Sequence, residues 1–121
     1  MSSENMQAVV VWTILLSFLV FRFLRFRRVK VQIPRLISEG ATVIDVRTEK
    51  EYAGGARPGS LNIPLYLVGQ ELDGRLKSLD KSKPVVVCCA SGTRSAMAAS
   101  TLRKAGFTQV FNAGPWRNTI T

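Results

Sequence analysis

The sequence contains no histidine, and this absence excludes several classes of active site. Triads of the Ser-His-Asp type need an imidazole base, and most zinc sites use histidine ligands. Cysteine is scarce too, because the chain has only Cys88 and Cys89, which are neighbours. A disulfide between adjacent residues closes a strained ring, so we expect free thiols and a reducing compartment. We expect neither a metal nor a cofactor.

Acidic residues are few: the 121-residue chain has 8 Asp and Glu against 17 Lys and Arg, a formal net charge of +9. This length allows one domain and little more, and 46% apolar residues indicate a folded chain. Five basic residues follow a single apolar segment: Arg22, Arg25, Arg27, Arg28 and Lys30. They account for most of the net charge. From Val31 onward the charges are nearly mixed, so we expect no nucleic-acid partner.

Charge is missing altogether from residues 5–21, a run of seventeen residues. A transmembrane helix needs about 20 apolar residues, and the residues after the run extend it if Arg22 and Arg25 reach the lipid headgroups. The sequence therefore predicts a membrane anchor over residues 1–30. A buried core helix and a cleaved signal peptide are the alternatives. Against a signal peptide stand Glu4 and the lack of a small-residue cleavage site.

The basic residues lie on one side of this apolar run, and this asymmetry predicts the topology. The positive-inside rule places the following domain, residues 31–121, in the cytoplasm, so that the protein is single-pass. The apolar run has no Gly-x-x-x-Gly pattern, and the sequence leaves the oligomeric state open.

Residues 31–121 alternate between helical and extended patterns. We expect strands at 42–46, 61–63, 83–89 and 108–111, and helices at 49–52, 65–79 and 95–104. Pro34 fits the first turn of a short helix that ends near Gly40. Thr48 and Glu51 have the spacing of a capping box. Such alternation predicts an α/β fold with a small parallel sheet and helices on both faces.

The two cysteines end the strongest strand and are followed by a small polar loop and a helix. Side chains alternate along a strand, so Cys88 and Cys89 point to opposite faces. Cys89 opens the loop, where the N-terminus of the next helix stabilises a thiolate, and Gly92 lets backbone N–H groups point inward as an anion nest. We therefore predict Cys89 as the nucleophile and Cys88 as a small buried residue. Arg94 is expected to tie the loop to a carboxylate or to add positive potential.

Four motifs resemble the rhodanese family of sulfurtransferases over about residues 33–121. The stretch VVVCCASGTRSAMAASTLRKAGF has its Cys-x-x-Gly-x-Arg-Ser frame, and FNAGPW resembles its closing strand and loop. The stretch VIDVRTEKEYAGGARPGSLNIP resembles its other two signatures. The matching residues are Cys89, Gly92, Arg94 and Ser95 in the loop, Asp45, Val46 and Arg47 upstream, and Gly59, Leu61, Asn62, Ile63 and Pro64 after them.

The resemblance implies sulfur transfer. A thiolate at Cys89 attacks the sulfane sulfur of a donor such as thiosulfate, becomes a persulfide, and passes the sulfur to cyanide or a thiol. The expected substrate-binding residues are the loop and one upstream arginine: Ala90, Ser91, Gly92, Thr93, Arg94 and Arg47. Asp45 and Ser95 are expected to give structural support. Arg47 also fits a solvated surface charge, and Asp45 fits a simple cap or ion pair.

Other functions fit parts of the same stretch. Counted from Cys88, the loop has the Cys-x5-Arg frame of a phosphatase or arsenate reductase, although Cys88 would then have to leave the strand one residue early. Adjacent cysteines after a valine run also fit simple core packing. A third possibility is a non-catalytic rhodanese-like module that docks a partner at the membrane.

Overall fold

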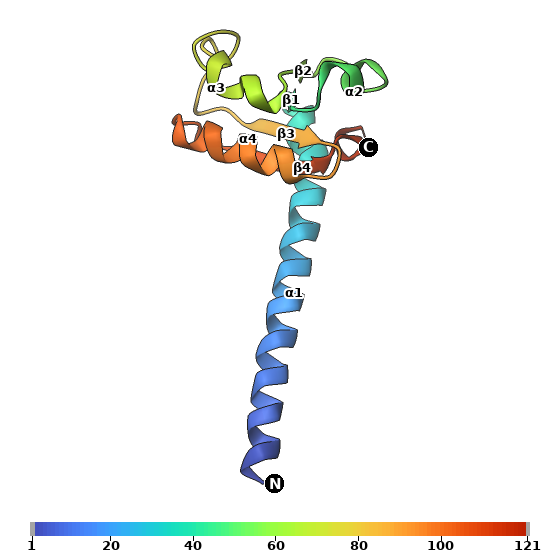
Figure 1. Cartoon of the computed structure of the whole chain (residues 1–121), viewed down its shortest axis with the longest axis vertical. Coiled ribbons are helices and arrows are strands. Elements are labelled where there is room, and N and C mark those ends of the chain that lie inside the picture. The colour runs from blue at the N-terminus through green and yellow to red at the C-terminus, as the bar shows by residue number, and fades with distance from the viewer. Residues whose placement is uncertain (1, 121) are drawn as a thin grey trace.

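The structure is a computed structural model that describes residues 2–120, apart from the side chains of residues 26–31. In chain order the elements are α1 (Ser3–Ser38), β1 (Thr42–Asp45), α2 (Glu49–Ala53), β2 (Leu61–Asn62), the 3-10 helix η1 (Leu65–Leu67), α3 (Val68–Glu71), β3 (Val85–Cys89), α4 (Thr93–Lys104), β4 (Val110–Pro115) and the 3-10 helix η2 (Trp116–Thr119). The strands form one sheet in the order β2-β1-β3-β4, and every neighbouring pair is parallel (Figure 1). The expected α/β fold is confirmed.

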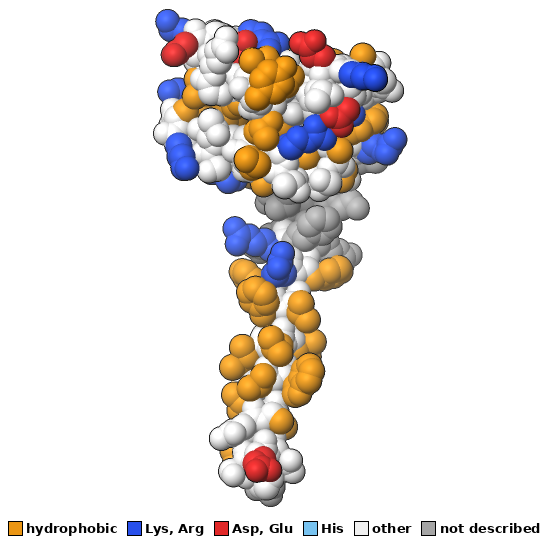
Figure 2. All heavy atoms as spheres, in the orientation of Figure 1, with side chains coloured by type: hydrophobic (Ala, Val, Ile, Leu, Met, Phe, Trp, Pro, Cys, Tyr) orange, Lys and Arg blue, Asp and Glu red, His pale blue; other side chains and the backbone are white. Residues whose placement is uncertain are grey.

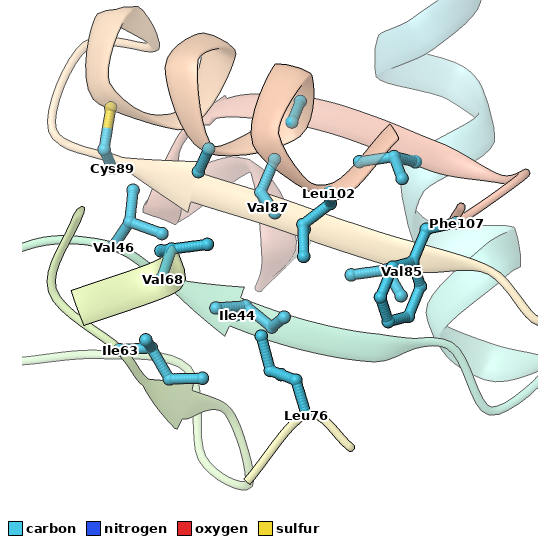
Figure 3. Close-up of a cluster of buried hydrophobic side chains, with 13 residues drawn as sticks. Ile44, Val46, Ile63, Val68, Leu76, Val85, Val87, Cys89, Leu102 and Phe107 are labelled. Carbon is cyan, nitrogen blue, oxygen red and sulfur yellow. The ribbon is translucent and has the colours of Figure 1, made fainter. Parts of the chain in front are cut away.

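Helices pack on both faces of this sheet. On one face Val85, Val87 and Cys89 pack with Leu102 of α4 (Figure 3). On the other face Val86 and Cys88 pack with residues of α1 and η2, namely Ile33, Leu36, Ile37 and Trp116. The alternation predicted for β3 is confirmed, and it separates the two adjacent cysteines into different cores.

The N-terminal helix differs from its sequence prediction in one respect. α1 is continuous from Ser3 to Ser38, and Pro34 lies inside it rather than in the first turn of a second helix. Proline removes one helical hydrogen bond, but Ile33 beside it is 1% exposed against the sheet, and this packing holds the last turns in place. The apolar segment therefore enters the domain without a loop (Figure 1).

The segment Ser3–Arg25 is long and apolar enough to cross a membrane, with a mean hydropathy of 2.0 and no part of it buried in the protein. A signal sequence shares these properties. On the face that Figure 2 shows, apolar side chains line most of this stretch, and basic side chains lie between them and the domain. The predicted basic residues Arg27, Arg28 and Lys30 lie outside the described side chains.

The helix predicted for residues 65–79 is mostly absent. Only η1 and the four-residue α3 form, and turns follow to residue 79. Gly69 and Gly74 lower helical propensity within this stretch. Leu76 still reaches the core at 1% exposure, which explains an apolar pattern that resembles a helix.

Candidate active site

Cys89 is the last residue of β3, and its thiol lies at the start of the following loop. The backbone N–H of Gly92 donates to Cys89 Sγ at 2.9 Å, and the Ser95 hydroxyl lies 3.3 Å from the same sulfur. Burial raises the pKa of this thiol, but hydrogen bonds from Ser95, Gly92 and Ser91 lower it more. The net pKa lies below its ordinary value, so the site favours a thiolate. Figure 3 shows the sulfur directed toward the start of α4.

Gly92 makes the tight loop possible. Its φ of +106° belongs to the left-handed region, and it precedes the first residue of α4. A Cβ at this position would lie 3.2 Å from Gly114 Cα in the neighbouring strand. The left-handed backbone angle and the close approach of Gly114 therefore both favour glycine at position 92, whose N–H contacts the Cys89 sulfur.

Cys88 lies on the opposite face of the sheet. Like Cys89 it is buried, at 1% exposure, and it packs with Val86 and Ile33. Burial and the nearby charge of Asp45 raise its pKa to about 12, although Arg47 opposes this shift. Cys88 therefore stays a neutral thiol at physiological pH.

Asn112 of β4 holds the loop in place through hydrogen bonds, and it is not among the site residues predicted from the sequence. Its Oδ1 accepts from the Ser95 hydroxyl at 2.6 Å and from Gly114 N at 2.9 Å, and its amide nitrogen donates to Gly92 O at 3.1 Å. The pairing of β3 with β4 shifts register beside Val87 and Cys88, and Asn112 lies at that irregularity. Asn112 thus connects the two residues that contact the Cys89 sulfur.

Arg94 ties the far end of the loop to a carboxylate, as expected. Its two terminal nitrogens donate to the two oxygens of Glu51, at 2.7 and 3.0 Å. Glu51 also completes the predicted capping box of α2 with Thr48. The hydrogen bonds from Arg94 are the largest cause that lowers the pKa of Glu51, to about 2. This ion pair joins α4 to α2 across the carboxyl edge of the sheet.

Comparison with known proteins identifies this arrangement. The family model described as the rhodanese-like domain matches residues 31–113, which is most of the chain. The chain belongs to the rhodanese-like family. It is 42% identical over 72 residues to the uncharacterized protein YqhL of Bacillus subtilis, an alignment that covers 60% of this chain and 54% of that protein. It is 37% identical over 71 residues to the thiosulfate sulfurtransferase PspE of Escherichia coli, which covers 59% of this chain and 66% of the relative.

Solved structures agree with this assignment. The human single-domain sulfurtransferase TSTD1 superposes with a TM-score of 0.60 at 31% identity, over 70% of this chain and 85% of that one. The chain spans between about half and two thirds of the lengths of the curated relatives YqhL and PspE. The family is therefore one of rhodanese-like sulfurtransferases.

Within this rhodanese-like domain, Asp45 and Arg47 form a buried pair. Arg47 donates from Nε and Nη2 to the Asp45 carboxylate, at 2.8 to 3.0 Å. Its Nη1 donates to the Glu51 carbonyl at 3.4 Å, and its Nη2 donates to the Gly55 carbonyl at 2.7 Å. Its guanidinium also lies 4.8 Å from the centre of the Trp116 ring. All three nitrogens of Arg47 have protein partners, so these contacts favour a structural role over substrate binding. The role predicted for Asp45 is consistent with the same contacts.

The remaining predicted loop residues of the rhodanese-like site face outward. Ala90, Ser91 and Thr93 are exposed, whereas Cys89 and Ser95 are buried. The loop thus has an exposed outer surface and a sulfur held beneath it.

Proposed function

We propose that this chain is a membrane-anchored sulfurtransferase that carries sulfane sulfur as a persulfide on Cys89. The observation that supports it is the contact of Cys89 Sγ with Gly92 N at 2.9 Å and Ser95 Oγ at 3.3 Å. The Gly92 N–H and the other backbone N–H groups of the loop stabilise negative charge on sulfur, first on the thiolate and then on the persulfide. The names of two relatives, the thiosulfate sulfurtransferases PspE and GlpE, support thiosulfate as a donor.

The proposed reaction has two steps. The Cys89 thiolate attacks the outer sulfur of thiosulfate, an S–S bond forms, and the old S–S bond breaks with its electron pair leaving on sulfite. A thiolate or cyanide then attacks the terminal persulfide sulfur, and the Cys89 thiolate is regenerated. The reaction does not call for a histidine base, because the lowered pKa of Cys89 favours the attacking thiolate. Ala90, Ser91, Gly92 and Thr93 supply the backbone N–H groups that surround the transferred sulfur, and Arg94 fixes the loop through Glu51.

The proposal also assigns a role to the N-terminal segment and a location to the domain. We propose residues 1–30 as a single-pass anchor and residues 31–121 as the catalytic domain on the cytoplasmic side. The five basic residues after the apolar run support this orientation, since such clusters stay on the cytoplasmic side.

Paired cysteine variants test the reaction. After incubation with thiosulfate, wild-type protein and Cys88→Ser should gain the mass of one sulfur atom on the cysteine peptide, and Cys89→Ser should not. Cyanide should then remove the added mass and release thiocyanate. If the gain followed Cys88, the phosphatase frame would be favoured, and release of phosphate from a generic phosphoester would be measured next. If no variant gained sulfur, a non-catalytic docking module would be favoured.

A further inference from the structure

A groove of about 930 Å³ lies between the N-terminal helix and the exposed outer surface of the loop that follows Cys89. The α1 side contributes Phe18, Phe21, Arg22 and Arg25. The domain side contributes residues from the loop, α4, β4 and η2, including Ser91, Gly92, Thr93, Ala96, Met97 and Pro115. The groove is therefore formed where the apolar helix meets the outer surface of the loop that carries Cys89.

The groove is apolar on both walls and basic at one end. Met97 is 57% exposed, and Phe18 and Phe21 are 57% and 60% exposed, so large apolar side chains border the space without filling it. Arg22 and Arg25 supply the charge, and none of the residues described as lining the groove is acidic. This combination matches an amphiphile with an anionic head and an apolar body.

The position along α1 indicates where such a ligand comes from. The apolar segment Ser3–Arg25 has 23 residues, which is roughly 35 Å of helix, against a hydrocarbon layer of about 30 Å. Phe18 and Phe21 thus fall near the end of the hydrocarbon, and Arg22 and Arg25 fall at headgroup level. Domain residues that share a groove with them must lie at the same depth.

We propose that this groove binds an anionic phospholipid, with its headgroup at Arg22 and Arg25 and the first part of an acyl chain against Phe18, Phe21 and Met97. The bound lipid holds the underside of the domain in the headgroup layer and places the outer surface of residues 91–93 against the membrane. This inference rests on the proposed membrane anchoring, but it does not depend on sulfur transfer.

The test uses the full chain in detergent with phosphatidylglycerol or phosphatidylcholine, and counts retained lipid by native mass spectrometry. Wild-type protein should retain phosphatidylglycerol preferentially. Two basic residues near an anionic surface correspond to a roughly 30-fold preference, which Arg22→Gln with Arg25→Gln should abolish. Arg27, Arg28 and Lys30 stay in this variant, so the basic flank that sets topology is kept.

Two further variants separate a built groove from a general effect of positive charge. Lys77→Gln with Lys104→Gln removes the same charge from exposed positions outside the groove and should leave the preference unchanged. Ala96→Trp fills the groove from the α4 side without altering charge, and it should reduce retention of phosphatidylglycerol. A photoreactive phosphatidylglycerol should crosslink to residues 91–97 in wild-type protein and not in Ala96→Trp.

Several outcomes would overturn the proposal: equal retention of both lipids, unchanged retention in Ala96→Trp, displacement of lipid by inorganic phosphate alone, or a mature protein that lacks residues 1–25. Persulfide formation on Cys89 is measured in the same samples. Lipid retention without a persulfide would refute sulfur transfer alone, and a persulfide without lipid preference would refute the groove alone.

Discussion

At the scale of single residues, Gly92 connects backbone geometry to chemistry. Its N–H contacts the Cys89 sulfur, its carbonyl accepts from Asn112, and its φ is +106°. A side chain there must adopt a left-handed backbone and meet Gly114 Cα at 3.2 Å. The geometry of the sulfur cradle therefore depends on one residue without a side chain.

We expect Gly92→Ala to destabilise the fold by about 1–2 kcal/mol and to lower persulfide formation by more than this loss of folded protein explains. Urea unfolding measures the first effect, and the sulfur-bearing peptide mass measures the second. Gly69→Ala is the matched control, because no atom lies within 4 Å of its added Cβ and its backbone is not left-handed. Equal effects of the two substitutions would contradict the role given to Gly92.

Glu51 gives a pH-dependent prediction. Its pKa is lowered from 4.5 to about 2, chiefly by hydrogen bonds from Arg94, so its stabilising effect is complete above about pH 4.5 and is lost as the pH falls toward 2. Glu51→Gln should lower stability near neutral pH, and the difference from wild type should vanish in acid. Glutamine can still serve in a capping box, so the variant mainly reports the pair with Arg94.

Unfolding curves at a series of pH values measure this difference. Glu49→Gln serves as the control, because Glu49 lies in the same helical turn but forms none of the ion pairs among the described residues. A difference for Glu51→Gln that stayed constant down to pH 2 would show that lost packing, and not charge, explains the effect.

At the scale of helices and strands, the sequence correctly predicted the structural features that depend on patterns within a few residues. The alternation of side chains along β3 predicted that Cys88 and Cys89 lie on opposite faces of the sheet. The spacing of Thr48 and Glu51 predicted the capping box. Each depends on a repeat within a few residues. The four parallel strands followed from the same kind of pattern.

Long-range partners could not be predicted in this way. Asn112 reaches Ser95 and Gly92 because β4 has an irregular register beside β3, and no local pattern specifies a register shift. The course of α1 through Pro34 depends on the packing of Ile33 against the sheet, which overrides the usual preference of proline for a first turn. The sequence did contain one signal for this residue, because Asn112 is part of the FNAGPW motif that resembles the closing strand and loop of the rhodanese family.

The last turns of α1 predict two different outcomes for truncation. Removing residues 1–28 keeps Ile33, Leu36 and Ile37 packed on the face of the sheet that contains Cys88. The product should therefore be soluble, folded and active. Removing residues 1–38 uncovers that face of the sheet and should cost several kcal/mol, because loss of one buried isoleucine side chain alone costs about 2–5 kcal/mol. Circular dichroism and persulfide formation compare the two products. If the shorter truncation folded but were inert, the anchor would contribute to catalysis directly.

At the scale of the whole molecule, the proposed topology is directly testable. A cysteine added after residue 121 should react with a membrane-impermeant thiol reagent only after intact cells are permeabilised, because the proposed topology, which rests on the five basic residues, places the domain in the cytoplasm. The test uses a Cys88→Ser, Cys89→Ser background, so that the added cysteine is the single thiol of the chain. Labelling without permeabilisation would favour export and the signal-peptide alternative.

The uninterrupted helix from Ser3 to Ser38 also determines how far the rhodanese-like domain can move relative to the N-terminal segment. A flexible linker would let the domain move freely around its point of attachment. The distance that the domain could reach would grow with the square root of the linker length. A helix that enters the domain without a loop allows no such motion (Figure 1). If residues 1–30 anchor the chain as proposed, Cys89 therefore stays at a nearly constant height above the bilayer. Encounters with a protein acceptor then become a search in two dimensions, and an acceptor held on the same membrane at the same height gains a large effective concentration over one in bulk solution.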